Sequence, residues 1–183
     1  MLRYQTAGTA QPFSTKSEIS RILQIHRYGK PMIYETISRL AEIITPNTRL
    51  LGLDVGSKTI GLAVSDSDLK VATAIDTIRR SKFSKDFEHL VKIIEDRKIG
   101  GLVIGLPISM DGTEGPACQS IRQFGANIIK RHEFAIAFWD ERLSTSAVQR
   151  FLTDEADMTR KRRSEVVDKL AATYILQGAL DSL

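Results

Sequence analysis

The chain has 183 residues, of which 42% are hydrophobic and 26% charged, values that suit a single globular domain with a full hydrophobic core. No apolar run approaches the roughly 18 residues of a membrane-spanning helix, and the first 20 residues lack the apolar core of a signal peptide. The only cysteine, Cys118, excludes an internal disulfide and a cysteine-based zinc site. We therefore expect a cytoplasmic protein that does not bind membranes.

The net charge of +4 lies entirely in the N-terminal segment. Residues 1–31 contain five basic residues and one acidic residue, whereas the remainder carries 21 of each sign. The average charge therefore gives no argument for nucleic-acid binding, and only the clustering of charge is informative. Because charge and composition change at Met32, we expect translation to start there, so that residues 1–31 do not belong to the native protein. The alternative is a cleaved organelle presequence, against which Glu18 and the short length argue.

The first predicted element belongs to an N-terminal extension over residues 1–48. Apolar side chains from Ile33 to Ile44 recur at helical spacing, which predicts a helix over 33–44. Proline and asparagine at 46 and 47 end this helix.

The rest of the chain, residues 49–183, is predicted to form one α/β domain. Apolar or alternating runs predict strands over 50–55, 59–66, 71–80, 101–107 and 134–139. Helical spacing predicts helices over 83–97, 117–131, 145–152 and 164–180, with an exposed basic loop over 159–163. The first three strands follow one another through tight turns and should be antiparallel, whereas the last two need crossover helices and so run parallel to the first. The expected fold is a mixed five-stranded sheet flanked by helices.

Two acids stand at the ends of predicted strands. Asp54 is the only polar side chain in its strand; it is either a functional carboxylate or a cap of the turn at Gly56. Glu141 follows the last strand, at the edge where α/β folds place ligands, or it is a surface residue that pairs with Arg142. Asp140 beside it should point the opposite way along the strand.

A third acid lies on the apolar face of the last predicted helix. Asp168, Ala171, Ala172 and Ile175 share this face by their spacing. A carboxylate there costs free energy unless something pairs with it, and the alternative to a functional role is a salt bridge to an arginine across the core.

Asp54, Glu141 and Asp168 together favour a catalytic metal site. Three carboxylates at one end of a sheet repel one another, and a divalent cation removes that repulsion. Oxygen ligands without a histidine or cysteine cluster favour Mg²⁺ or Mn²⁺ over Zn²⁺. A site of this kind suits phosphoryl transfer, in which one ion activates water and a second, about 3.5–4 Å away, stabilises the leaving oxygen.

Candidate nucleic-acid contacts surround these acids. They are basic or hydroxyl side chains that could bind phosphate: Lys58, Arg142, Ser144, Thr145, Arg160, Lys161, Arg162 and Arg163. The alternative for the basic run at 160–163 is a solvated loop without a partner.

Four ordered segments resemble the YqgF/RuvX family, the Holliday-junction-resolvase-like pre-16S rRNA nucleases: DVGSKTIGLAVSD, GLPISMDGTEGP, DERLSTSAV and RKRRSEVVDKLAATYILQ. The resemblance covers residues 50–181 and implies a ribonuclease H-like fold with an acidic triad at Asp54, Glu141 and Asp168. It also implies a Mg²⁺- or Mn²⁺-dependent endonuclease in the cytoplasm that matures the 5′ end of small-subunit ribosomal RNA, with precursor rRNA or ribosome assembly particles as partners. One departure is Ser109, where the family usually has asparagine.

Several alternatives remain open beside this RNA nuclease. One is a Holliday junction resolvase acting on branched DNA, which should work as a dimer; the sequence leaves a monomer or a homodimer open. Another is a non-catalytic RNA-binding factor in ribosome assembly, against which the retention of all three acids argues. A sugar-kinase-like protein, indicated by the phosphate-loop-like segment DVGSKTIG, would need a duplicated domain and a much longer chain.

Overall fold

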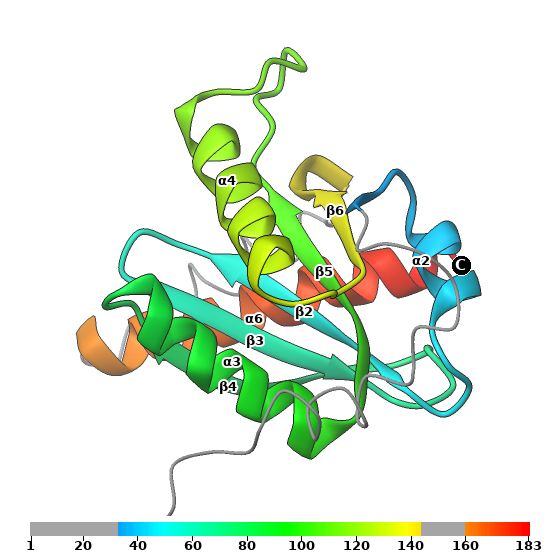
Figure 1. Cartoon of the computed structure of the whole chain (residues 1–183). Coiled ribbons are helices and arrows are strands. Elements are labelled where there is room, and N and C mark those ends of the chain that lie inside the picture. Colours follow the sequence, from blue (N-terminus) through cyan, green and yellow to red (C-terminus); the bar gives the residue numbers. More distant parts are fainter. Residues whose placement is uncertain (1–32, 144–159) are drawn as a thin grey trace, which may run out of the picture.

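The structure is a computed structural model that describes residues 33–143 and 160–183, with the side chains of the second range described from Lys169 onward. Figure 1 shows a twisted sheet with helices on both faces. In chain order the elements are β1 (Ile33–Tyr34), α2 (Ile37–Ile43), β2 (Arg49–Val55), β3 (Thr59–Ser65), β4 (Ala72–Arg79), α3 (Phe83–Arg97), β5 (Ile99–Leu106), α4 (Pro116–Arg131), β6 (Ile136–Asp140), the 3₁₀ turn η1 (Glu141–Leu143) and α6 (Arg160–Asp181).

The sheet has the strand order β1-β6-β5-β2-β3-β4. Strand β3 is antiparallel to both β2 and β4, and β5 and β6 run parallel to β2. The prediction of a mixed, ribonuclease H-like α/β sheet is therefore confirmed, although the sheet has six strands among the described residues instead of five. Because β2, β4, β5 and β6 all run the same way, their carboxyl ends meet at one edge of the sheet.

The extra strand corrects the helix predicted over residues 33–44. Ile33 and Tyr34 form β1, which pairs in parallel with Ile136 and Ala137 of β6. The helix α2 begins only at Ile37, because the Thr36 side chain accepts a hydrogen bond from the Arg39 backbone N–H and caps it. A strand of two residues has no periodicity, so its pairing could not be seen in the sequence.

A second correction concerns the basic residues before the last helix. The sequence predicts a loop over 159–163, but α6 already begins at Arg160. Lysine and arginine are good helix formers, so a run of positive charge does not by itself interrupt a helix. The helix predicted over 145–152 lies outside the described residues.

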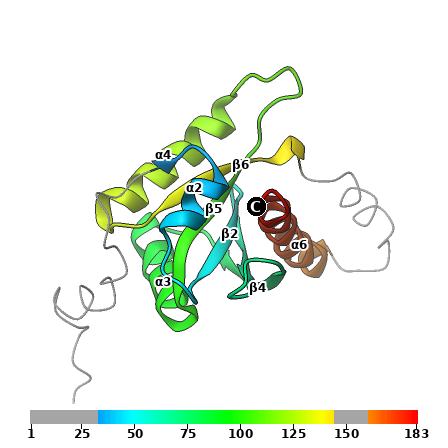
Figure 2. The same ribbon diagram turned by 90° about the vertical axis from the view of Figure 1, so that its right-hand side faces the viewer.

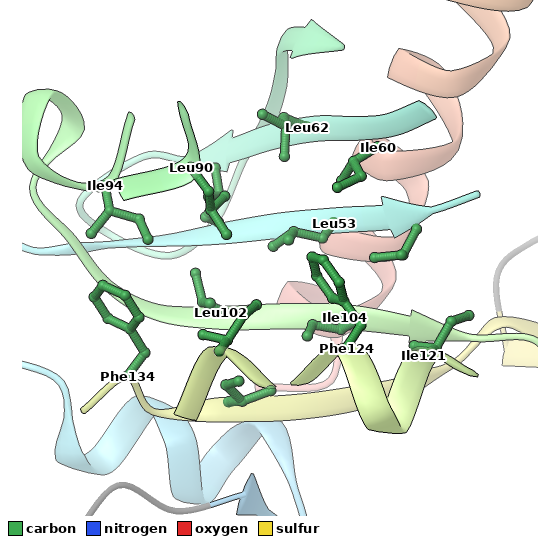
Figure 3. Packing of buried hydrophobic residues seen from close by; sticks show 14 of the residues in the cluster. Leu53, Ile60, Leu62, Leu90, Ile94, Leu102, Ile104, Ile121, Phe124 and Phe134 are labelled. Carbon is green, nitrogen blue, oxygen red and sulfur yellow. The ribbon is translucent and has the colours of Figure 1, made fainter. Parts of the chain in front are cut away.

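Two hydrophobic clusters cover the two faces of the sheet. On one face, α3 and α4 pack against the strands through fully or nearly fully buried side chains, among them Leu90, Phe124 and Ile128, and Figure 3 shows this packing. On the other face, buried side chains of α6 and α2 form the second cluster, and Figure 2 shows α6 well apart from α3 and α4. Among the helices of the described residues, none is long and apolar enough to cross a membrane.

The helix α6 approaches the sheet closely at Gly52 of β2. A Cβ atom at this position would lie 2.6 Å from the Cβ of Leu176 and 3.0 Å from the carbonyl oxygen of Ala172. Only a residue without a side chain leaves room for the helix there. Since strand side chains alternate between faces, Asp54, two residues further along β2, points toward this same α6 face.

Candidate active site

Asp54 and Glu141 meet at the edge where the parallel strands end. Asp54 is the penultimate residue of β2, and Glu141 directly follows β6. Strand β5 lies between these two strands, and its Gly105 lies next to Glu141. A Cβ atom at Gly105 would lie 2.5 Å from Oε1 of Glu141 and 2.5 Å from Cδ1 of Ile175 in α6. The Glu141 carboxylate therefore lies over Gly105, on the α6 face that Asp54 also occupies.

The electrostatics of Glu141 show that the two carboxylates interact. Burial, together with the negative charges of Asp54 and then Asp140, raises the pKa of Glu141 from 4.5 to about 7. The site therefore holds a proton near neutral pH unless a cation replaces it. A hard divalent cation would favour the ionised form, and carboxylate oxygens are its preferred ligands.

Asp140 lies on the opposite side of β6 from Glu141. Phe138, two residues earlier, lies beside Gly125 of α4, and alternation places Asp140 on that same face. Its carboxylate accepts hydrogen bonds from the side chain and the backbone N–H of Arg142, and this pairing lowers the pKa of Asp140. The sequence places Arg142 among the nucleic-acid contacts and contains no signal for this pairing.

Lys58 is exposed in the turn between β2 and β3, next to the strand that carries Asp54. Arg80 holds this turn, because its backbone N–H donates to the carbonyl oxygen of Lys58 and its Nη1 donates to that of Gly56. The Arg80 guanidinium also lies over the ring of Phe124, 5.8 Å from its centroid. Arg80 is a supporting residue that sequence reasoning missed, since its contacts depend on tertiary packing.

The other candidates are only partly placed. Ser144 and Thr145 lie outside the described residues. The four basic residues 160–163 and Asp168 belong to α6, but their side chains are not described. Asp168 precedes Ala172 by one helical turn, and the carbonyl oxygen of Ala172 faces Gly52. Among the described side chains, no group of three or more acids, histidines or cysteines could hold a metal ion.

A ribonuclease H-like sheet with paired carboxylates at its carboxyl edge defines a nuclease of that fold class. The chain belongs to the RuvX family, because the sequence model of that family, described as a Holliday junction resolvase, matches residues 48–182. This match confirms the resemblance predicted from the four sequence segments.

Individual relatives agree with the family assignment. A protein named "Putative pre-16S rRNA nuclease" from Paramagnetospirillum magneticum is 58% identical over 145 residues, which cover 79% of this chain and 93% of that protein. A protein of the same name from Ruegeria pomeroyi is 57% identical over 152 residues, covering 83% and 98%. Among solved structures, a Thermus thermophilus RuvC bound to a Holliday junction substrate matches with a TM-score of 0.46 and 13% identity, covering 70% of this chain and 91% of that one.

We expect Glu141→Gln to stabilise the metal-free protein at pH 8 but not at pH 5. The folded-state pKa of Glu141 is raised, so the free energy of unfolding falls as pH rises from about 4.5 to 7 and stays low above that. Glutamine has no charge to lose, and the gain at pH 8 should be about 1–2 kcal/mol after solvent screening is allowed for.

Urea unfolding with a chelator at both pH values measures this difference. The matched control is Glu133→Gln, which removes an exposed acid just before β6 and should change stability little at either pH. Equal effects of Glu141→Gln at pH 5 and pH 8 would contradict the prediction.

Proposed function

We propose that this protein is a divalent-metal-dependent endonuclease that hydrolyses RNA phosphodiester bonds while the 5′ end of pre-16S ribosomal RNA matures. The observation that carries the proposal is the Asp54–Glu141 pair, two carboxylates close enough for the charge of one to raise the pKa of the other. A charge arrangement that is unfavourable without a cation is typical of a metal site. The names of the relatives from Paramagnetospirillum and Ruegeria support pre-16S rRNA as the substrate.

The residues of this chain fit Mg²⁺ or Mn²⁺. Asp54 and Glu141 would hold the ion, and Asp168 would be the third ligand. Gln177 of α6 accepts a hydrogen bond from the backbone N–H of Ala72, at the start of β4, so the earlier turns of α6 run toward the edge where β4 and β2 end (Figure 1). When bound there, such an ion would supply an activated water and would stabilise the charge on the leaving oxygen.

Basic side chains would bind the substrate backbone beside this centre. Lys58 is exposed in the turn that joins the strand of Asp54 to β3. Arg160, Lys161, Arg162 and Arg163 at the start of α6, together with Ser144 and Thr145, would provide further phosphate contacts. These contacts carry no base specificity, so the recognition of precursor rRNA would come from its shape or from the assembling ribosomal particle in the cytoplasm.

Cleavage of two substrates by the purified protein tests the proposal. A small-subunit rRNA precursor and a four-way DNA junction are each incubated with Mg²⁺, with Mn²⁺ and with a chelator. We expect the RNA to be cut only when metal is present. Cleavage of the junction alone would contradict the RNA assignment and favour the resolvase activity that the family description names, and cleavage of neither would favour a non-catalytic assembly factor.

A further inference from the structure

We propose that Arg142 is a positioning residue that ties the end of β6 to the loop over residues 107–115, and that it is not a contact to the substrate backbone. This inference rests on the proposed function, because its purpose is to hold Glu141 and this loop at one site. The loop connects β5 to α4, and it leaves the sheet at the same edge as Glu141.

The guanidinium of Arg142 is already bound by Asp140. Its Nε donates to both carboxylate oxygens at 3.0 Å, and its Nη2 donates to Oδ2 at 2.6 Å. The backbone N–H of Arg142 adds a bond of 3.0 Å to Oδ1, which fixes the turn that begins at Glu141. The two-pronged geometry fixes the orientation of the guanidinium. The Asp140 carboxylate also offsets the positive charge that Arg142 could offer a phosphate, although Arg142 is itself exposed to solvent.

The remaining arm of the guanidinium reaches the loop. Nη1 of Arg142 donates to the carbonyl oxygen of Ser109 at 3.4 Å. That oxygen also accepts a hydrogen bond of 2.8 Å from the backbone N–H of Gly112. The backbone N–H of Ser109 in turn donates to the carbonyl oxygen of Thr113. Gly112 has a positive φ of 86°, as this tight turn requires. The loop thus has a defined conformation, and Arg142 holds it from the side of β6.

Two neighbouring chain segments are joined in this way. Leu106 and Asp140 are register partners at the ends of β5 and β6, so the loop and the Glu141 turn leave the sheet side by side. Glu141 stands between the two residues of the ion pair, and loosening the pair would let its carboxylate move. A displacement of about 1 Å in such a site lowers the rate on the order of a hundredfold.

Four variants test this role: Arg142→Gln, Asp140→Asn, their double variant and Arg142→Lys. We expect each single variant to lower kcat for precursor RNA by about 10–100-fold with little change in KM, and the double variant to be no worse than either one. Arg142→Lys should lower kcat as Arg142→Gln does, because lysine cannot form the two-pronged pair with Asp140. Hydrogen exchange of the amides in 107–115 should accelerate in every variant, and Mn²⁺ should bind more weakly. Arg39→Gln, which breaks the exposed pair with Glu42 in α2, is the matched control. It should leave kcat, the loop exchange and Mn²⁺ binding unchanged.

The exchange and Mn²⁺ measurements need no substrate, so they separate this inference from the proposed function. If the wild type cuts neither substrate but the loop responds as expected, the positioning role stands and the nuclease assignment fails. If Arg142→Gln raises KM and weakens its salt dependence while Asp140→Asn does not, Arg142 is a phosphate contact and the inference is wrong. Unchanged loop exchange in both single variants would also overturn it.

Discussion

Replacing Asp54 by asparagine should reduce metal-dependent RNA cleavage by at least about a thousandfold. The substitution keeps the shape of the side chain and removes the charge that would bind the cation. It should also lower the pKa of Glu141, because the charge of Asp54 is one cause of its elevation. The folded state should therefore persist, and the loss should appear in kcat and in Mn²⁺ affinity.

Cleavage kinetics and Mn²⁺ titration of Asp54→Asn measure this effect. The chain contains a single tryptophan, Trp139, which lies beside Gly178 of α6 and two residues before Glu141, so its fluorescence should report metal binding. Asp76→Asn provides the control, since Asp76 is a strand carboxylate in β4 that pairs with His89. Full activity of Asp54→Asn would exclude Asp54 from the catalytic site, whatever the substrate.

Gly105→Ala should nearly abolish activity, with a loss of about a hundredfold, while the protein still folds. The new methyl group would occupy the space of Oε1 of Glu141 and Cδ1 of Ile175. Both are ends of flexible side chains that can turn away, so the sheet and α6 need not move. The Glu141 carboxylate, however, would leave its place beside Asp54, and Mn²⁺ binding should weaken together with cleavage.

Gly52→Ala is the informative comparison for this variant. Its methyl group would meet the Cβ of Leu176 and the carbonyl oxygen of Ala172, which cannot move without the helix. We expect Gly52→Ala to lower the free energy of unfolding by about 1–3 kcal/mol, a larger loss than for Gly105→Ala. Urea unfolding and Mn²⁺ titration of both variants separate stability from metal binding. Wild-type Mn²⁺ affinity in Gly105→Ala would show that Gly105 does not position Glu141.

Much of the architecture could be predicted because it depends on local pattern and chain order. The alternation of strands and helices after β4 required β5 and β6 to run parallel to β2, and the carboxyl ends of parallel strands lie at one edge. That rule alone brings Asp54 and Glu141 to the same edge. The spacing of Ala172 and Ile175 likewise predicted which face of the last helix packs on the sheet, and both residues are buried there.

Other features required the folded chain, because they depend on contacts between residues distant in sequence. Strand β1 exists only because β6 offers an edge to pair with, and a stretch of two residues has no pattern that could predict it. The Arg142 side chain could reach a phosphate or a neighbouring carboxylate, and only the geometry of the turn after β6 selects Asp140. Chain order therefore determines which acids share an edge of the sheet, whereas the close packing of α6 and the missing side chain of Gly105 determine how near they come and how strongly their charges interact.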